Sequence, residues 1–178
     1  MADIVLAGFG GQGVLTAGMI LINAAAAQDR EVSWTSSYGA EMRGGTASCT
    51  VVISEEEIGN PYPATLDMLV VMNEPSYDKF IGDVKEGGVV VVNTSLIKEK
   101  FYPEHLNVYE VAATDMANAL ENARGTNLVM LGGLMKASGM MDKETFAEQL
   151  NAFFDKKGKN SPRNEECFIR GYDQAVKA

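Results

Sequence analysis

The glycine-rich segment Gly8-Phe9-Gly10-Gly11-Gln12-Gly13 constrains the fold of this chain more than any other feature of its sequence. It follows an apolar run at residues 3–7, which is typical of a strand buried on both faces. A helical pattern rich in Leu, Ile and Ala comes next at residues 14–27, and residues 31–34 resemble a second strand. This succession predicts a β-α-β unit with a right-handed crossover, and therefore a parallel sheet.

The remaining sequence predicts one α/β domain over residues 1–178. The expected architecture is a Rossmann-like layered sheet, mostly parallel, with helices on both faces and a helical C-terminus. Phe168, Tyr172 and Val176 are expected on one face of the last helix. Further strands are expected at residues 46–54, 67–73, 89–92 and 106–111, loops or turns at 35–45, 60–63 and 84–88, and helices at 75–81, at 127–137 and after the capping residues Asp142 and Ser161.

Three interpretations of the glycine segment remain open. The spacing Gly8-x-Gly10-x-x-Gly13 resembles the dinucleotide-binding fingerprint, in which an acidic residue at the end of the second strand holds the ribose. Residues 34–36 are Trp-Thr-Ser at that position, so NAD binding has little support. Alternatively, the glycines allow close packing of strand and helix, and a side chain at Gly10 would then block close approach at the turn. In the third interpretation a phosphate-bearing ligand or a partner chain sits at the helix N-terminus.

Charge and rare residue types exclude several classes of function. The net charge of −9 argues against nucleic-acid binding, which needs a basic surface to neutralise phosphates. The sequence has no signal-peptide pattern and no apolar run long enough to cross a bilayer, so we expect a cytoplasmic protein that binds no membrane. Cys49 and Cys167 are too few for an iron–sulfur cluster and are expected to be free thiols. The single histidine, His105, gives no basis for a zinc site or a catalytic triad.

A second distinctive segment follows the expected strand at residues 31–34. It reads Ser36-Ser37-Tyr38-Gly39-Ala40-Glu41-Met42-Arg43-Gly44-Gly45-Thr46-Ala47. In this order after the glycine segment, it resembles the gamma subunit of 2-oxoacid:ferredoxin oxidoreductases. Residues 67–73, the pair Pro75-Ser76 and residues 85–88 agree with the same family, and the resemblance covers most of the chain.

The resemblance implies a non-autonomous, metal-free subunit of an enzyme that converts a 2-oxoacid, in the first place 2-oxoglutarate, to its acyl-coenzyme A. Such enzymes use thiamine diphosphate, coenzyme A and iron–sulfur clusters, and they pass electrons to ferredoxin. The implied partners are alpha, beta and ferredoxin-like delta subunits, and a homodimer contact is also compatible. This subunit is expected to pack near the thiamine and coenzyme A site and to bind no cofactor alone. In agreement, it lacks a Gly-Asp-Gly metal-diphosphate motif, because Gly82-Asp83 is followed by Val84.

The residues expected to contact a cofactor or a partner come from both distinctive segments. Glu41 and Arg43 are one residue apart, so an extended loop would place both on the same side, where Arg43 could hold a phosphate or a carboxylate. A solvated loop is the simpler alternative. No catalytic residue and no metal ligand is expected, and an autonomous nucleotide-binding module, either a dinucleotide enzyme or a sensor, is the alternative function. The expected site comprises Gly8, Gly10, Gly11, Gln12, Gly13, Ser37, Tyr38, Gly39, Glu41 and Arg43.

Overall fold

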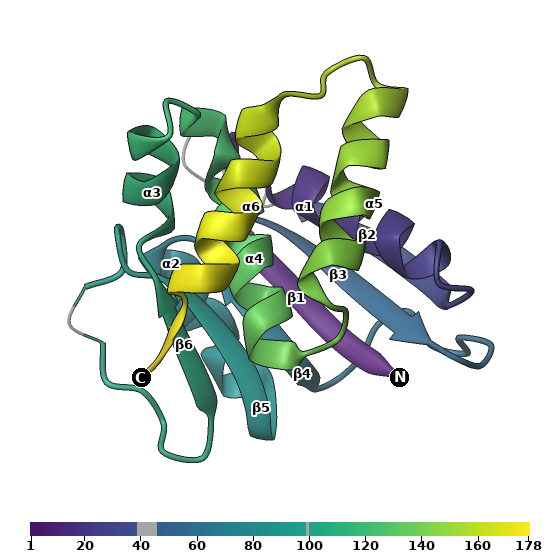
Figure 1. Ribbon diagram of the computed structural model, residues 1–178. Helices are drawn as coiled ribbons and strands as arrows, with labels where there is room; N and C mark the ends of the chain where they lie inside the picture. Colours follow the sequence, from purple (N-terminus) through teal and green to yellow (C-terminus); the bar gives the residue numbers. More distant parts are fainter. Residues whose placement is uncertain (39–45, 99) are drawn as a thin grey trace.

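The structure is a computed structural model that describes residues 1–38, 46–98 and 100–178. These residues form a seven-stranded sheet in the order β2-β3-β1-β4-β5-β6-β7 (Figure 1). The strands are β1 (Ala2–Phe9), β2 (Glu31–Tyr38), β3 (Thr46–Ser54), β4 (Leu66–Val71), β5 (Val84–Asn93), β6 (Asn107–Val111) and β7 (Val176–Lys177). The helices are α1 (Val14–Ala26), α2 (Glu74–Phe80), α3 (Ala113–Ala119), α4 (Thr126–Ser138), α5 (Lys143–Lys156) and α6 (Pro162–Gln174), with short 3-10 helices η1 (Ile81–Asp83) and η2 (Ala123–Gly125).

The sheet is mostly parallel, as the sequence predicts. Strand β1 pairs in parallel with β4, β4 with β5, and β5 with β6. Strand β3 is antiparallel to both β1 and β2, and β7 is antiparallel to β6. Strand β2 therefore runs in the direction of β1 but is separated from it by β3. The predicted β-α-β unit is therefore present in split form, because β3, the second strand of the β2–β3 hairpin, lies between the two parallel strands β1 and β2.

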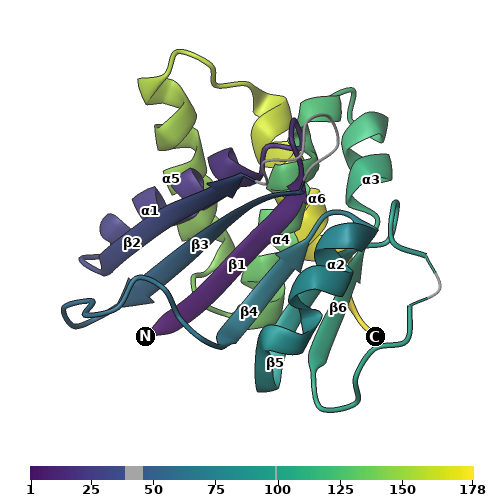
Figure 2. The same cartoon turned by 180° about the vertical axis from the view of Figure 1, so that it is seen from behind.

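Helices cover both faces of the sheet, which confirms the layered architecture. Helices α1, α3, α4, α5 and α6 lie on one face, and α2 lies on the other (Figures 1 and 2). Strand β1 contributes to both layers: Ile4 and Leu6 are buried in the core under the larger helical layer, and Val5 and Ala7 are buried in the core on the α2 side. Burial on both faces explains the uninterrupted apolar run of β1.

Helices α4 and α6 cross at two glycines. A Cβ atom on Gly132 would lie 2.1 Å from the carbonyl oxygen of Phe168, and one on Gly171 would lie 1.9 Å from the carbonyl oxygen of Val129. The backbones therefore touch directly, and α4 is buried, as its apolar sequence predicts. The expected caps are also confirmed: the Asp142 side chain accepts a hydrogen bond from Thr145 N, and the Ser161 side chain accepts one from Arg163 N.

Several expected boundaries were wrong. Residues 35–38 continue β2, because the β2–β3 ladder extends to the pair Tyr38 and Ala47. Residues 84–88 belong to β5 rather than to a turn. The last helix ends at Gln174, and Val176 lies in β7 and is 63% exposed rather than packed on a helix face. The short helix α3 and the strand β7 were not expected from the sequence.

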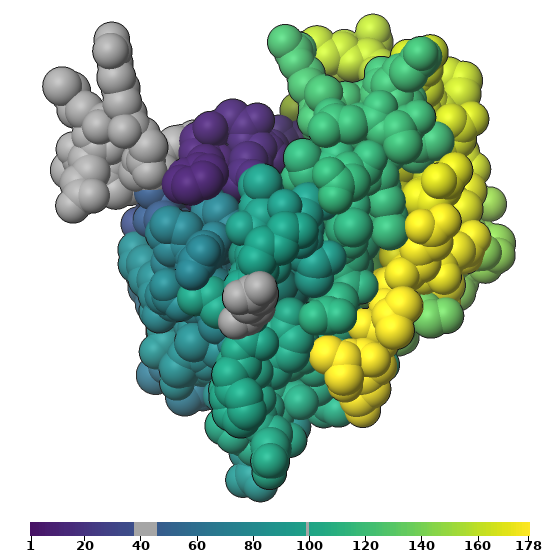
Figure 3. Space-filling model, turned by 90° about the vertical axis from the view of Figure 1, so that its left-hand side faces the viewer, coloured from purple at the N-terminus to yellow at the C-terminus, as the bar shows by residue number. Residues whose placement is uncertain are grey.

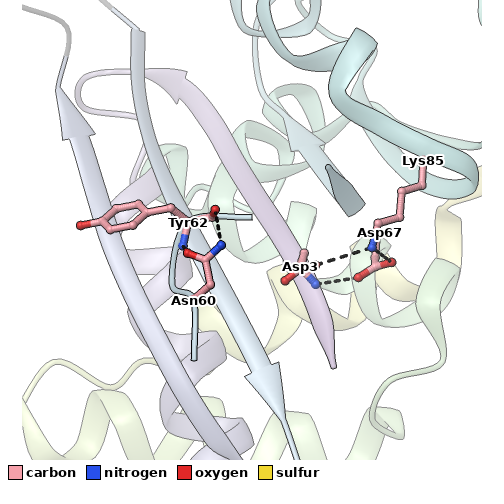
Figure 4. A network of polar contacts seen from close by, with 5 residues as sticks. All are labelled: Asp3, Asn60, Tyr62, Asp67 and Lys85. Atoms are coloured by element: carbon pink, nitrogen blue, oxygen red, sulfur yellow. Dashed lines mark hydrogen bonds and ion pairs between the residues drawn. The ribbon is translucent and has the colours of Figure 1, made fainter. Parts of the chain in front are cut away.

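A polar network joins the amino ends of β1, β4 and β5 (Figure 4). The backbone N–H of Asp3 donates to Asp67 Oδ2 at 2.8 Å, and Lys85 Nζ lies 3.0 Å from Asp67 Oδ1. The hydrogen bond to Asp67 is the main cause of the raised pKa of Lys85. In the same view, the Asn60 side chain bonds both the N–H and the carbonyl of Tyr62, which confirms the expected turn. These partly exposed contacts fix strand ends, and the ion pairs among them contribute little free energy.

In the part of the chain that the structure describes, no helix combines the length and the apolar character needed to cross a membrane.

Candidate functional site

The glycine segment forms a tight turn between β1 and α1, held by the side chain of Gln12. The N–H of Gln12 donates to the carbonyl of Phe9 at 3.2 Å. Its Oε1 atom accepts hydrogen bonds from Phe9 N at 2.6 Å and from Asn73 Nδ2 at 3.4 Å. Gln12 was expected among the contact residues, but its amide oxygen is already occupied within the chain. Its role here is to hold the loop against β1 and α2.

The four glycines of the segment fall into two pairs. A Cβ atom on Gly8 would lie 2.6 Å from Gln12 Oε1, and one on Gly13, where φ is +75°, would lie 2.5 Å from Asn127 Nδ2. A Cβ atom on Gly10 or Gly11 would meet nothing within 4 Å. Close packing therefore explains Gly8 and Gly13, whereas Gly10 and Gly11 leave their backbone open to a ligand or partner. Within the described chain, a side chain at Gly10 would meet no other group, so the predicted damage from a larger residue there concerns the approach of a ligand or partner in assembly.

A groove of about 410 Å³ extends from the glycine segment towards the helical layer. It lies where the N-termini of α1 and α4 meet the C-terminal end of α5. In Figure 3 the purple surface of the N-terminal segment borders the green surface of the α3–α4 region at the upper edge of the molecule. The lining residues are Gly11, Gly13, Thr16, Asn122, Arg124, Asn127, Leu128, Phe153, Phe154, Lys157, Lys159 and Asn164.

The groove concentrates positive charge in a protein whose net charge is −9. Arg124, Lys157 and Lys159 are exposed, and none of them forms an ion pair within residues 1–38, 46–98 and 100–178. Helices α1 and α4 both begin here, and neither has a side-chain cap, so their N-terminal dipoles add partial positive charge. Buried Asn127 connects the two helices by donating from Nδ2 to the carbonyl of Gly13 at 3.0 Å. The arrangement favours an anion with an apolar portion, because Leu128, Phe153 and Phe154 also line the groove.

The end of β2 lies at the same edge of the sheet as the glycine segment. Gly8 pairs with Ala47 on β3, and Ala47 pairs with Tyr38 on β2, so these residues form one row across three strands. Two strand spacings separate Gly8 from Tyr38, which is about 10 Å. Ser37 is exposed. Gly39, Glu41 and Arg43 lie outside the described residues.

The topology removes the basis for a dinucleotide site of the ordinary kind. In the Rossmann fingerprint, the ribose-binding acid stands at the end of the strand that follows the first helix and neighbours the first strand. Here antiparallel β3 occupies that neighbouring place. Residues 34–36 lie within β2, two strands from β1, and contain no acid.

The cysteines do not fit an iron–sulfur cluster. Cys49 on β3 and Cys167 on α6 are both free thiols and both buried. Burial raises the pKa of Cys49 to about 12 and also raises the pKa of Cys167, so the thiolate that would bind a metal is disfavoured. Among the described residues no group of three or more His, Cys, Asp and Glu side chains is placed to hold a metal ion.

Sequence reasoning missed the basic side of the groove. Lys157 and Lys159 follow α5, and Arg124 lies in η2, both far in sequence from the glycine segment. The basic run at residues 156–159 is visible in the sequence, but its position beside α1 depends on how the helices pack. The hydrogen bond between Asn127 and Gly13 joins residues 114 positions apart.

The model of the pyruvate ferredoxin/flavodoxin oxidoreductase family matches residues 3–174. The chain belongs to this family. Among its relatives, the ketoisovalerate oxidoreductase subunit VorA of Methanothermobacter marburgensis is 42% identical over 174 residues, which cover 97% of this chain and 36% of that protein. The 2-oxoglutarate synthase subunit KorC of Methanocaldococcus jannaschii is 38% identical over 177 residues, which cover 97% of this chain and 93% of that protein. The chain thus spans about a third of VorA and nearly all of KorC.

Solved structures of the family share the fold. The gamma subunit of a keto/oxoacid ferredoxin oxidoreductase from Geobacter sulfurreducens superposes with a TM-score of 0.79 at 27% identity, over 97% of both chains. A chain of the 2-oxoglutarate:ferredoxin oxidoreductase from Magnetococcus marinus, solved with 2-oxoglutarate, coenzyme A and succinyl-CoA bound, gives 0.80 at 25% identity. That match covers 98% of this chain and 30% of the Magnetococcus chain. The chain is therefore of the gamma-subunit type within its family.

Proposed function

We propose that this protein is the gamma subunit of a 2-oxoacid:ferredoxin oxidoreductase that converts 2-oxoglutarate to its acyl-coenzyme A. The observation that supports this substrate is the match to a 2-oxoglutarate synthase subunit over 97% of this chain and 93% of the relative. Its partners are alpha, beta and ferredoxin-like delta subunits, which hold the thiamine diphosphate and the iron–sulfur clusters. The assembled enzyme is cytoplasmic.

A second candidate substrate is 2-ketoisovalerate, favoured by the 42% identity to VorA. Because two cysteines are too few for an iron–sulfur cluster, the assembled enzyme is needed to distinguish the two substrates. Co-purified complex is assayed with each 2-oxoacid, coenzyme A and a viologen dye. We expect kcat/KM for 2-oxoglutarate to exceed that for 2-ketoisovalerate at least tenfold. A higher kcat/KM for 2-ketoisovalerate would make 2-ketoisovalerate the substrate instead of 2-oxoglutarate. Turnover by this chain alone would contradict its assignment as a subunit.

Within the complex, we assign the positively charged groove to the phosphate-bearing end of coenzyme A. Arg124, Lys157 and Lys159 supply charge, and the open backbone at Gly10 and Gly11 permits close approach of a phosphate. Bound there, coenzyme A supplies the thiol that accepts the acyl group. The residues of this chain position the phosphate-bearing end of coenzyme A, and the catalytic subunits position its reacting thiol. We assign Ser37, Tyr38, Gly39, Glu41 and Arg43 to the contact with those subunits at the same edge of the sheet.

The groove assignment is tested by Arg124→Ala and Lys159→Ala in the assembled enzyme. Each substitution removes a charge-assisted contact worth about 1.5–3 kcal/mol, so the KM for coenzyme A should rise roughly ten- to a hundredfold. The kcat should stay unchanged, because neither side chain reaches the reacting atoms. Lys177→Ala in β7 is the matched control, since it removes an exposed lysine outside the groove. Equal coenzyme A dependence in all three variants rejects the groove as the binding site.

Arg43→Ala tests the proposed contact with the catalytic subunits. We expect the variant chain to fold normally and the assembled enzyme to lose roughly ten- to a hundredfold in activity or in affinity for its partners, through one lost charge-assisted hydrogen bond.

Calorimetric titration with NAD tests the alternative of an autonomous nucleotide-binding module. A low-micromolar dissociation constant would favour that module over the subunit.

A further inference from the structure

Asn73 lies where the neighbouring strands β1 and β4 send their connections to opposite faces of the sheet. The two strands pair in parallel, and α1 follows β1 on the larger helical layer, whereas α2 follows β4 on the other face (Figure 2). Such a reversal between adjacent parallel strands is the place where α/β proteins bind ligands. Asn73 comes shortly after the end of β4 and is only 1% exposed, so its polar side chain is buried at this place.

The Asn73 side chain connects α2 to the glycine segment. Its Oδ1 atom accepts a hydrogen bond from Ser76 N at 2.9 Å, which caps α2. A backbone N–H can only donate, so this bond fixes the orientation of the amide and leaves Nδ2 facing Gln12 Oε1 at 3.4 Å. Gln12 Oε1 in turn accepts from Phe9 N at 2.6 Å. Asn73 therefore belongs both to the start of α2 and to the support of the glycine segment.

Gly8 makes room for the Gln12 amide. A Cβ atom on Gly8 would lie 2.6 Å from Gln12 Oε1 and 3.0 Å from the Cβ atom of Met72, the residue before Asn73. The amide of Gln12 thus occupies the space that a side chain on Gly8 would need. It is packed at the junction of β1 and β4, with Asn73 as its neighbour.

The turn at Gly10 and Gly11 is closed twice by the residues on either side of it. Gln12 N donates to the carbonyl of Phe9 at 3.2 Å, and Phe9 N donates to Gln12 Oε1 at 2.6 Å. A Cβ atom on either glycine would meet nothing within 4 Å. Their backbone therefore depends on Phe9 and Gln12 for its position, and a rotation of the Gln12 amide would release one of the two closures.

We propose that Asn73 is a positioning residue for coenzyme A, which acts through Gln12 to hold the backbone of Gly10 and Gly11 where a phosphate approaches. This inference rests on the proposed coenzyme A site. Asn73 is too buried to reach the coenzyme itself, so its contribution is the geometry of the turn. Loss of the contact lowers the affinity of the assembled enzyme for coenzyme A and leaves kcat unchanged, because the catalytic subunits position the reacting thiol.

Asn73→Asp separates this role from the cap of α2. Aspartate is as good a helix cap as asparagine, so the bond to Ser76 N is kept. The atom that faces Gln12 Oε1 becomes an oxygen, and two acceptors at this distance repel each other. Rotation of the Gln12 amide relieves the repulsion and takes the acceptor away from Phe9 N. The KM for coenzyme A in the assembled enzyme should rise at least tenfold, with kcat unchanged.

Asp142→Ala is the matched control for a loss of stability. It removes the side-chain cap of α5, at the end of the molecule where Met1 and Ala2 lie. Its KM for coenzyme A should equal that of the wild-type enzyme even where its urea midpoint falls as far as that of Asn73→Asp. A KM that rises with the loss of stability in both variants overturns the proposal, since the role of Asn73 would then be structural alone.

A double-mutant cycle tests whether Asn73 acts through Gln12. Gln12→Met removes the shared acceptor Oε1, so Asn73→Asp should raise the KM no further in that background. The Phe9 amide should exchange its hydrogen faster in Asn73→Asp than in the wild-type chain. Additive effects on the KM, or an unchanged Phe9 exchange rate in Asn73→Asp, overturn the proposal.

Arg124→Ala keeps this result apart from a failure of the coenzyme A site. If Arg124→Ala raises the KM for coenzyme A and Asn73→Asp does not, the positioning role is rejected and the groove assignment stands. If neither variant changes the KM, the groove assignment and the positioning role are both rejected.

Discussion

Two groups of glycines in this molecule look alike in the sequence and differ in what surrounds them. At the crossing of α4 and α6, Gly132 and Gly171 touch the backbone of the opposite helix, so any side chain would displace a helix. In the loop between β1 and α1, Gly10 and Gly11 face open space. The crossing holds the helical layer together, whereas the loop leaves backbone exposed at the edge where α/β proteins bind ligands. At the crossing the approaching group is part of the same chain, whereas at the loop the open space would admit the phosphate of the proposed coenzyme A site.

The largest effect is expected at the crossing. Gly171→Ala places a Cβ atom 1.9 Å from the carbonyl oxygen of Val129, which cannot move without shifting α4. Overpacking against a backbone should lower the free energy of unfolding by about 3 kcal/mol. Urea unfolding measures this loss. Gly82→Ala is the control, because its Cβ atom meets nothing within 4 Å, and a similar loss there would mean that steric contact is not the cause.

A smaller effect is expected at Gly13. This residue belongs to the loop between β1 and α1, but it is closely packed, like the glycines where α4 and α6 cross. Alanine in its left-handed conformation, at a φ of +75°, costs roughly 1–2 kcal/mol, and the Asn127 side chain 2.5 Å away must also move. We expect a loss of about 2 kcal/mol in unfolding free energy, accompanied by weaker coenzyme A binding in the assembled enzyme. If stability is unchanged, the hydrogen bond from Asn127 to Gly13 does not fix the start of α1.

Gly10→Ala should separate stability from function. Since nothing lies within 4 Å of the added methyl group, the free energy of unfolding should change by less than about 0.5 kcal/mol. The KM for coenzyme A in the assembled enzyme should rise, because the methyl group occupies the space through which a phosphate would approach. Unfolding curves and steady-state kinetics on the same preparation measure both. A stability loss equal to that of Gly13→Ala would show that the open pair of glycines is structural after all.

The smallest effect is expected in the reactivity of the two thiols. Cys49 reports on the packing of α1, and Cys167 reports on the packing of α6. A Cβ atom on Gly18 of α1 would lie 2.6 Å from Cys49 Sγ, and one on Gly125 would lie 2.6 Å from Cys167 Sγ. Both thiols are buried, so neither should react with a disulfide reagent at pH 8 in the folded chain, and both should react in denaturant. Gly171→Ala should expose Cys167 first, and Gly10→Ala should expose neither. Fast labelling of the wild-type chain would contradict the burial.

The Cys49 thiol makes the free energy of unfolding depend on pH. The pKa of Cys49 is about 12 in the folded chain against 9.0 for a free thiol. The folded chain therefore keeps a proton that the unfolded chain loses, and stability falls as the pH rises from about 9 towards 12. Cys49→Ala should reduce this decline in thermal melts above pH 9.

The sequence predicts most of the elements, because their signals are local. The apolar run of β1, the caps Asp142 and Ser161, and the apolar character of α4 each predict an element that the structure confirms. What the sequence does not predict depends on contacts between distant segments. The insertion of β3 between β1 and β2, the extension of β2 to Tyr38 and the two-residue β7 all depend on strand pairing.

The candidate site shows the same division. The glycine segment is recognisable from its spacing, and its position after β1 follows from the local pattern. The cations opposite it belong to η2 and the end of α5, and only the packing of helices brings them to the groove. Gln12 illustrates the converse: it lies within the distinctive motif, yet its amide oxygen is bonded within the chain. Motif membership alone does not distinguish a residue that contacts a ligand from one that supports the loop.

The place of β3 in the sheet also determines the order in which a growing chain can assemble. Strand β1 precedes β3 and β4 in the chain, and these are its neighbours in the sheet, so it has no strand partner until residues 46–54 have been made. The hairpin of β2 and β3 needs only local contacts and can close earlier. We expect the hairpin to form first and to present β3 as the template on which β1 aligns, a sequence of events that pulse-labelled hydrogen exchange during refolding would detect. The apolar strand β1 is thus made before its partners, and until they are made it is exposed to chaperones and to aggregation.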